Sequence, residues 1–138
     1  MSKGDLRLSD YLTEQRMRHL VELALEEDLG RGDVTSDLLV PSDVGARAVL
    51  RSRDHGVIAG LDLSAMVFTA VDSRVDFVAL VKDGDDVASG QELAELSGAA
   101  RSLLRAERVA LNFLQRLSGI ATLTSRYVKA VRGTRARI

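Results

Sequence analysis

A row of arginines follows one side of a predicted helix over residues 101–118. At about 100° per residue, its members fall on one line of the helix surface. They are Arg101, Arg105, Arg108, Asn112 and Gln115, with Arg116 at the edge. The opposite side is apolar, and Glu107, the one carboxylate of the segment, points away from the line. Arginine offers a planar fork of donors that fits carboxylates and phosphates, so this arginine row suggests recognition of an anion.

Two interpretations of the arginine row stay open from the residue types alone. An isolated row of cations is most often a solvated helix face. Here the row has no carboxylate partners at the i,i+4 spacing that stabilises exposed helices. The rest of the helix is apolar enough to be buried, which favours an interface or a binding site.

Charge is divided unevenly along the 138 residues, whose net charge is −1. Residues 101–138 hold nine lysines and arginines against Glu107 alone, a net charge of +8, so the remainder carries −9. This division suggests an anionic ligand or association between unlike surfaces. Aromatic residues make up only 4%, which disfavours nucleic-acid binding. No apolar run approaches the roughly 20 residues of a membrane span, so no membrane contact and a cytoplasmic location are expected.

Other patterns in the sequence predict little chemistry. The chain has no cysteine, which excludes disulfides and thiol catalysis. His19 is expected beside the apolar face of the first helix, at its boundary with solvent, and His55 in a loop. The glycines at 30–32 are too few for a dinucleotide fingerprint. Residues 83–96 resemble the hairpin of biotinyl and lipoyl carrier domains, but Lys82 precedes the turn instead of occupying its tip.

An acidic cluster closes the first predicted helix. Glu26, Glu27 and Asp28, together with Asp33, could bind a divalent cation through oxygen atoms. A polar helix end running into a loop is the simpler interpretation. Because negative charge at a helix C-terminus opposes the helix dipole, we expect an arginine partner nearby, such as Arg31.

The elements that position these residues alternate between helices and short strands. The first helix is expected to begin at a cap formed by Ser9 or Asp10 and to run to about Asp28. Gly30 follows at the position of a C-terminal cap.

The middle of the chain predicts strands around one helix. Residues 45–53 alternate apolar and cationic, as in a strand with one solvated face, and their expected partner is 56–59. A helix is predicted over 60–71 with Asp62 as its cap. Two alternating strands that flank a turn region are predicted within 75–96.

The last part of the chain is predicted to be helical. Gly98 is expected to end the strands, and the helix of the arginine row to break at Ser118 and Gly119. A second helix over 120–131 and the beginning of a strand at 135–138 complete the order. This order fits an α+β sandwich with a mainly antiparallel sheet and flanking helices. A chain that ends on a bare strand suggests a βα unit cut at its first step, and hence a missing second domain.

Four segments, in chain order, resemble the quinolinate phosphoribosyltransferase family, also called nicotinate-nucleotide pyrophosphorylase (carboxylating). They are residues 24–36 (ALEEDLGRGDVTS), residues 56–61 (GVIAGL), the hairpin with Asp83, Gly84 and Gly90, and residues 106–122 (AERVALNFLQRLSGIAT). The resemblance implies an N-terminal α/β sandwich followed by a C-terminal α/β barrel. The expected division is a flexible N-terminus over 1–8, the sandwich domain over 9–115, and over 116–138 a linker helix with the first strand of a barrel that is otherwise missing.

The resemblance also implies a reaction. Quinolinate and phosphoribosyl pyrophosphate give nicotinate mononucleotide, carbon dioxide and pyrophosphate with Mg²⁺, a glycosyl transfer of NAD biosynthesis. In the family, two subunits pair so that the N-terminal domain of one covers the barrel of the other. An arginine reaches across to the substrate's carboxylates, and in this sequence it is Arg108, with Arg105 a possible second contributor.

The expected barrel would supply the catalytic residues and the metal ligands, so this chain is expected to hold neither and to be inactive alone. The alternative is a stand-alone α+β module that binds an anion or a protein without catalysis.

Overall fold

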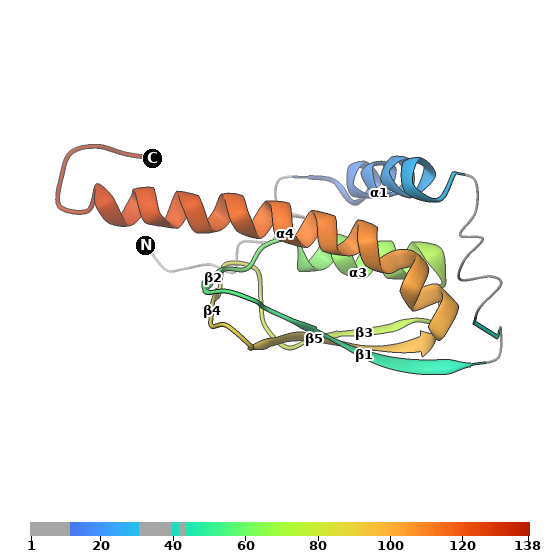
Figure 1. Cartoon of the computed structure of the whole chain (residues 1–138). Coiled ribbons are helices and arrows are strands. Elements are labelled where there is room, and N and C mark those ends of the chain that lie inside the picture. Colours follow the sequence, from blue (N-terminus) through green and yellow to red (C-terminus); the bar gives the residue numbers. More distant parts are fainter. Residues whose placement is uncertain (1–11, 31–39, 42–43) are drawn as a thin grey trace.

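The computed structural model describes residues 12–30, 40–41 and 44–138, and these residues form three helices and five short strands (Figure 1). In chain order the elements are α1 (Glu14–Leu29), β1 (Gly45–Arg51), β2 (Gly56–Val57), α3 (Leu61–Val71), β3 (Asp76–Ala79), β4 (Asp86–Val87), β5 (Glu92–Ala99) and α4 (Ala100–Ala130). Every strand pairing is antiparallel. The predicted α+β class with a mainly antiparallel sheet is confirmed.

The main sheet has three strands in the order β1-β5-β3, and β2 pairs with β4 in a separate ribbon. The expected pairing of the first strand with residues 56–59 is wrong. β1 instead pairs with β5, from Gly45 opposite Ala99 to Arg51 opposite Glu92. The physical reason is length, because β5 matches the seven residues of β1, whereas β2 has only two residues. β5 also continues one residue past Gly98, where the strands were expected to end.

All three helices lie on one side of the main sheet, with α3 and α4 against it and α1 outside them (Figure 1). The buried side chains of the main core come from all of these layers. They include Met17, Val21, Leu63, Val67, Phe68, Val75, Leu96, Leu103, Ala106, Val109 and Ala110. Phe68 and Phe77 join α3 to the sheet with ring centroids 5.9 Å apart. The core thus fixes α4 against the sheet through its first four turns.

The start of α1 differs from the prediction. Thr13 is the N-terminal cap, and the Arg16 amide donates a hydrogen bond of 3.4 Å to its hydroxyl. The expected caps Ser9 and Asp10 lie outside the described residues. At the other end, Gly30 is the C-terminal cap, as predicted, with right-handed helical backbone angles.

A distant carboxylate caps α3, so the prediction of Asp62 as its cap is wrong. The helix begins after Gly60, and Asp83 of the β3–β4 turn accepts hydrogen bonds from the amides of Gly60 (2.9 Å) and Leu61 (3.0 Å). Asp62 lies in the first turn, where its charge still favours the helix dipole. Asp83 thus caps α3 from the β3–β4 turn, while the Gly84 amide of the same turn donates to the Ile58 carbonyl (2.8 Å).

The expected break at Ser118 and Gly119 is absent, because α4 is one helix of 31 residues. A glycine inside a helix costs only about 1 kcal/mol, and tertiary hydrogen bonds surround this one. The Ala59 amide donates to the Ser118 hydroxyl (3.0 Å), and the Val57 amide donates to the Thr122 hydroxyl (2.9 Å). These two hydroxyls, one turn apart, tie the helix to β2 and to the residues that follow it, on both sides of Gly119.

The end of the chain also differs from the prediction, since residues 135–138 form no strand. The C-terminal half of α4 extends beyond the sheet (Figure 1). The expected domain boundary between residues 115 and 116 falls inside this helix, and residues 1–8 lie outside the described residues. The division into domains stays a prediction.

Asp72 joins the end of α3 to the first turn of α4. Its carboxylate accepts hydrogen bonds from the Arg74 side chain (2.9 and 3.1 Å), the Arg74 amide (3.0 Å) and the Ser102 hydroxyl (2.8 Å). These donors, the Arg74 guanidinium first, hold the pKa of Asp72 well below its usual range.

We expect D72N to lower the free energy of unfolding at pH 7. Because the folded pKa of Asp72 is lowered, its stabilisation is present above its ordinary pKa of about 4 and is lost as the pH falls toward the folded pKa. Urea unfolding of both chains at pH 7, 5, 3 and 2 measures the difference, which should shrink below about pH 4. The exposed Asp76, changed to asparagine, is the control, and a difference independent of pH would contradict the assignment.

Candidate functional site

Arg108 lies on the outer side of α4, opposite the part of the helix that packs on the core. The buried residues Ala106, Val109 and Ala110 surround it in the sequence, so the helical period directs Arg108 toward solvent. Its side chain is 76% exposed. Nη1 of Arg108 donates a hydrogen bond of 3.3 Å to Oδ1 of Asp28 on the last turn of α1. The predicted site residue is therefore exposed, charged and held by a carboxylate from another helix.

The other arginines of the row lie in different environments. Arg101 donates from Nε to the Val40 carbonyl, beside the first turn of α4. Arg105 is half-buried, with its Nε out of contact with solvent. Asn112 and Arg116 are exposed farther along the helix. The arginine row is thus not evenly solvated. Arg101 and Arg105 are partly buried, whereas Arg108 presents its guanidinium to solvent.

The acidic cluster contributes one residue to this site. Asp28 takes an arginine partner, as the helix dipole led us to expect, and that partner is Arg108; Arg31 lies outside the described residues. Asp33 also lies outside them. Among the described residues no three acidic or histidine side chains are placed to hold a metal ion. His19 and His55 are exposed.

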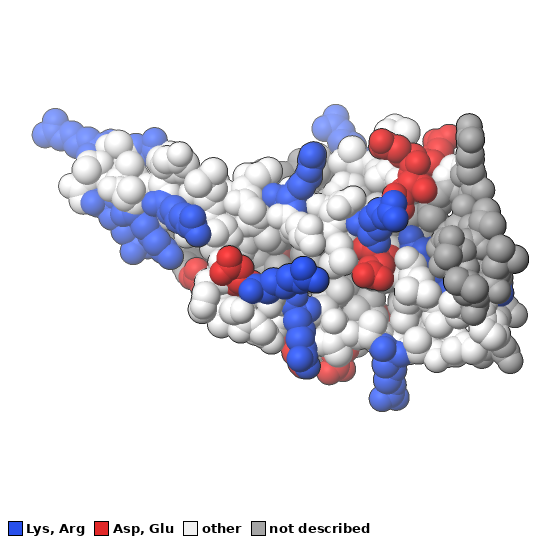
Figure 2. All heavy atoms as spheres, in the orientation of Figure 1, with Lys and Arg blue, Asp and Glu red and all other residues white. Residues whose placement is uncertain are grey.

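Positive charge gathers on the projecting half of α4. Figure 2 shows lysine and arginine side chains over this end of the molecule, while most carboxylates lie on the body. Lys129 approaches Asp86 of β4 at 3.9 Å. After Leu114 no residue of α4, which is described throughout, is buried. Large apolar side chains are exposed there: Ile120 (64%), Leu123 (52%), Tyr127 (54%) and Val128 (39%).

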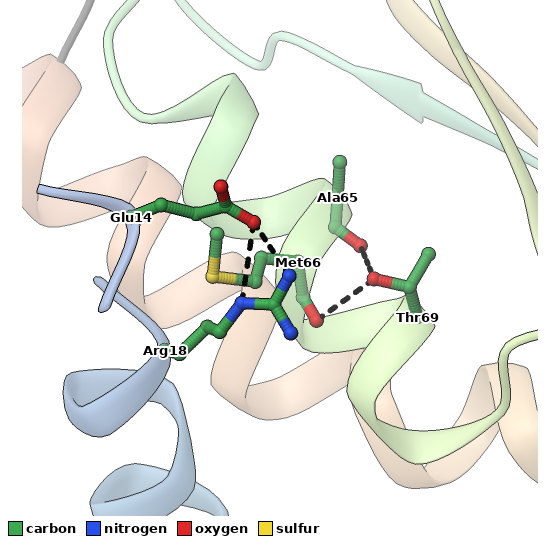
Figure 3. A network of polar contacts seen from close by, with 5 residues as sticks. All are labelled: Glu14, Arg18, Ala65, Met66 and Thr69. Carbon is green, nitrogen blue, oxygen red and sulfur yellow. Dashed lines mark hydrogen bonds and ion pairs between the residues drawn. The ribbon is translucent and has the colours of Figure 1, made fainter. Parts of the chain in front are cut away.

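Two hollows lie apart from the arginine site in the described part of the chain. The first, of about 780 Å³, lies between α1 and α3. Figure 3 shows that its polar groups bond locally: Arg18 pairs with Glu14 (2.5 Å), and the Thr69 hydroxyl donates to carbonyls of its own helix, those of Ala65 and Met66 (3.1 Å each). These groups are therefore already engaged within their own helices.

The second hollow, of about 940 Å³, is an open groove between β1 and α4. Leu50, Leu104 and Leu111 are among its lining side chains, and Arg51 on its rim pairs with Glu92 at 2.6 Å. Most of its surface is apolar, although charged side chains, among them Arg47, Arg53 and Glu107, also line it. No described helix has the length and apolar character needed to cross a membrane.

Two of the segments that carry the family resemblance contact each other in the fold. A side-chain carbon on Gly56 would lie 2.6 Å from the Thr122 hydroxyl, and one on Gly60 would lie 2.8 Å from Leu117. Sequence reasoning missed the roles of Ser118 and Thr122. The signal was available, because two small hydroxyl residues four apart on a helix share a face, and glycines such as Gly56 and Gly60 admit the close approach of a helix.

Comparisons with known proteins agree on one family. The family model described as "Quinolinate phosphoribosyl transferase, N-terminal domain" matches residues 33–118. A nicotinate-nucleotide pyrophosphorylase (carboxylating), chloroplastic, from Oryza sativa subsp. japonica is 43% identical over 109 residues, which cover 78% of this chain and 29% of the relative. The Mycobacterium leprae nicotinate-nucleotide pyrophosphorylase (carboxylating) is 42% identical over 124 residues, covering 88% of this chain and 44% of the relative.

The backbone comparison gives the same result. The crystal structure of NadC from Streptococcus pyogenes superimposes with a TM-score of 0.83 and 41% sequence identity. The match covers 87% of this chain and 44% of that protein. The chain therefore spans less than half the length of these relatives.

Proposed function

The chain belongs to the quinolinate phosphoribosyltransferase family, and from that premise we propose that it is the N-terminal domain of an enzyme of NAD biosynthesis. The proposed reaction joins quinolinate and phosphoribosyl pyrophosphate to give nicotinate mononucleotide, carbon dioxide and pyrophosphate. The observation that carries the proposal is the match of residues 33–118 to the family's N-terminal domain. The names of the rice and Mycobacterium leprae relatives support the same reaction class.

Within this proposal Arg108 binds the carboxylates of quinolinate across the interface of a homodimer. Its exposure of 76% leaves the guanidinium available to a second subunit, and the buried side of α4 fixes the backbone that carries it. A dianionic substrate is best held by a forked, permanently charged donor. Arg105, one turn away and half-buried, adds to the positive field without contacting the substrate.

The remaining chemistry is assigned to the C-terminal part that the relatives possess. That part would supply the catalytic groups and the ligands of Mg²⁺, whose charge neutralises developing negative charge on the pyrophosphate. The exposed apolar side chains of α4 after Leu114 suit a surface covered by such a part. This chain alone is then inactive. A cytoplasmic location is part of the same proposal, although the name of the rice relative places that relative in the chloroplast.

A grafted enzyme tests the proposal. This chain replaces the matching N-terminal part of the Streptococcus pyogenes relative, and formation of nicotinate mononucleotide from quinolinate and phosphoribosyl pyrophosphate is measured with Mg²⁺. The unaltered relative is the positive control, and the 138-residue chain alone is the negative control. Activity in the grafted dimer and none in the chain alone is expected. A folded, dimeric graft without activity would favour the alternative, a stand-alone binding module.

A further inference from the structure

Asp28 occupies a position that local physics disfavours. α1 ends with Glu26, Glu27 and Asp28 and has no basic residue in its last turn. Carboxylates there face the negative end of the helix dipole, a small but unfavourable interaction. The Asp28 residue as a whole is exposed, like Glu26 and Glu27, but its side chain is only 23% exposed where it meets Arg108. Its contact with Arg108 suggests a use beyond the stability of α1.

The contact between Asp28 and Arg108 occupies only part of the guanidinium. Among the described residues, Oδ1 of Asp28 accepts from Nη1 alone, at 3.3 Å, and this leaves Nη2 and Nε for a ligand. The two residues lie 80 positions apart in the sequence and come from different helices, each anchored in the core. A long side chain that is 76% exposed would otherwise sample many rotamers, and ordering it on substrate binding costs free energy.

We propose that Asp28 is a positioning residue, which holds the Arg108 guanidinium in the orientation that receives a dicarboxylate substrate. This inference rests on the proposed function, since it assigns a second residue to the same site. Asp28 orders the side chain before the substrate arrives, so less rotamer entropy is lost on binding. Its charge works against an anionic ligand, and the proposal therefore requires that the gain from orientation exceed this repulsion.

The opposite signs of these two effects give a sharp test in the grafted enzyme. If Asp28 acted only through its charge, D28N would lower the KM for quinolinate, because a negative charge next to the anion is removed. Positioning predicts that D28N raises this KM about tenfold with kcat changed less than about twofold. D28E, which keeps the carboxylate on a longer side chain, should recover part of the loss. A KM that is unchanged or lowered in D28N would overturn the proposal.

E27Q is the matched control, since it removes the same charge from the same exposed helix turn. Its KM should stay within about twofold of wild type or fall slightly, as expected for screened charge alone. Circular dichroism melting curves of both variants establish that they are folded. A loss in E27Q equal to that in D28N would show a general charge effect and would also contradict the positioning role.

A measurement on the 138-residue chain separates this inference from the proposed function. Nitrogen-15 relaxation of the Arg108 Nε–H group reports how tightly the guanidinium is held. Its order parameter should fall in D28N and stay unchanged in E27Q. An inactive grafted wild type with this result would refute the proposed function alone, whereas an unchanged order parameter in D28N would refute the positioning role.

Discussion

Replacing Arg108 with alanine in the grafted enzyme should raise the KM for quinolinate about 100-fold. The change removes a charge-assisted, forked contact, worth about 2–3 kcal/mol when made to a carboxylate. The KM for phosphoribosyl pyrophosphate should change much less, because we place that donor on groups of the C-terminal part. Folding should be unaffected, since the side chain is 76% exposed. Steady-state kinetics with each substrate varied in turn measure both effects.

Two variants make this result specific to Arg108. R116A removes the same charge from an exposed position at the edge of the arginine row and should leave the KM for quinolinate near wild type. R108K keeps the charge but loses the fork, so it should recover only part of the affinity. If R108A bound quinolinate as well as the unaltered graft does, the assignment of Arg108 to the substrate would be wrong.

The G60A variant should lower the free energy of unfolding of the chain by about 2–4 kcal/mol. Gly60 has φ of +99°, a backbone conformation that costs a residue with a side chain about 1–2 kcal/mol. The added carbon would also lie 2.8 Å from Cδ1 of Leu117 and 3.4 Å from its Cβ. Urea unfolding followed by circular dichroism measures the loss.

Gly84 provides the matched control for this prediction. Its φ is +94°, but a side-chain carbon there would meet nothing within 4 Å. G84A should therefore cost only the backbone term, about 1–2 kcal/mol, and the difference between the variants isolates the contact with Leu117. The double variant G60A/L117A should show a coupling between the two sites. Equal losses in G60A and G84A would mean that the chain relaxes around Leu117 without cost.

The sequence predicted most helices and strands, but it did not predict which elements pair with or cap one another. The alternation of residues 45–51 identified a strand and its solvated side, and the helix over 61–71 followed from its apolar content. Alternation tells which way side chains point, but it does not choose between two possible partner strands, and the choice of 56–59 was wrong. The prediction of Asp62 as the cap of α3 was wrong for the same reason. The carboxylate that caps this helix is that of Asp83, about 20 residues along the chain.

At the candidate site, too, the sequence predicted local features and missed long-range contacts. Helical periodicity alone placed Arg108 on the outer side of α4, where the structure has it. The dipole argument indicated that Asp28 needs a cation, and the structure supplies one from a helix 80 residues away. The spacing of Ser118 and Thr122 puts both hydroxyls on one face of a helix, but it does not tell which backbone amides donate to them, and Gly119 was taken as the end of the helix. Long-range contacts decide both cases, and no window of the sequence contains them.

The continuity of α4 means that the number of residues between Arg108 and Ser118 cannot vary freely. One uninterrupted helix carries Arg108 toward its start and the hydroxyls of Ser118 and Thr122 farther on. A single inserted or deleted residue between them would rotate one group against the other by about 100°, and an insertion of seven would nearly restore the angle but shift it by about 10 Å. Substitutions along the outer side of α4 can therefore accumulate between Arg108 and Ser118, whereas insertions and deletions there cannot.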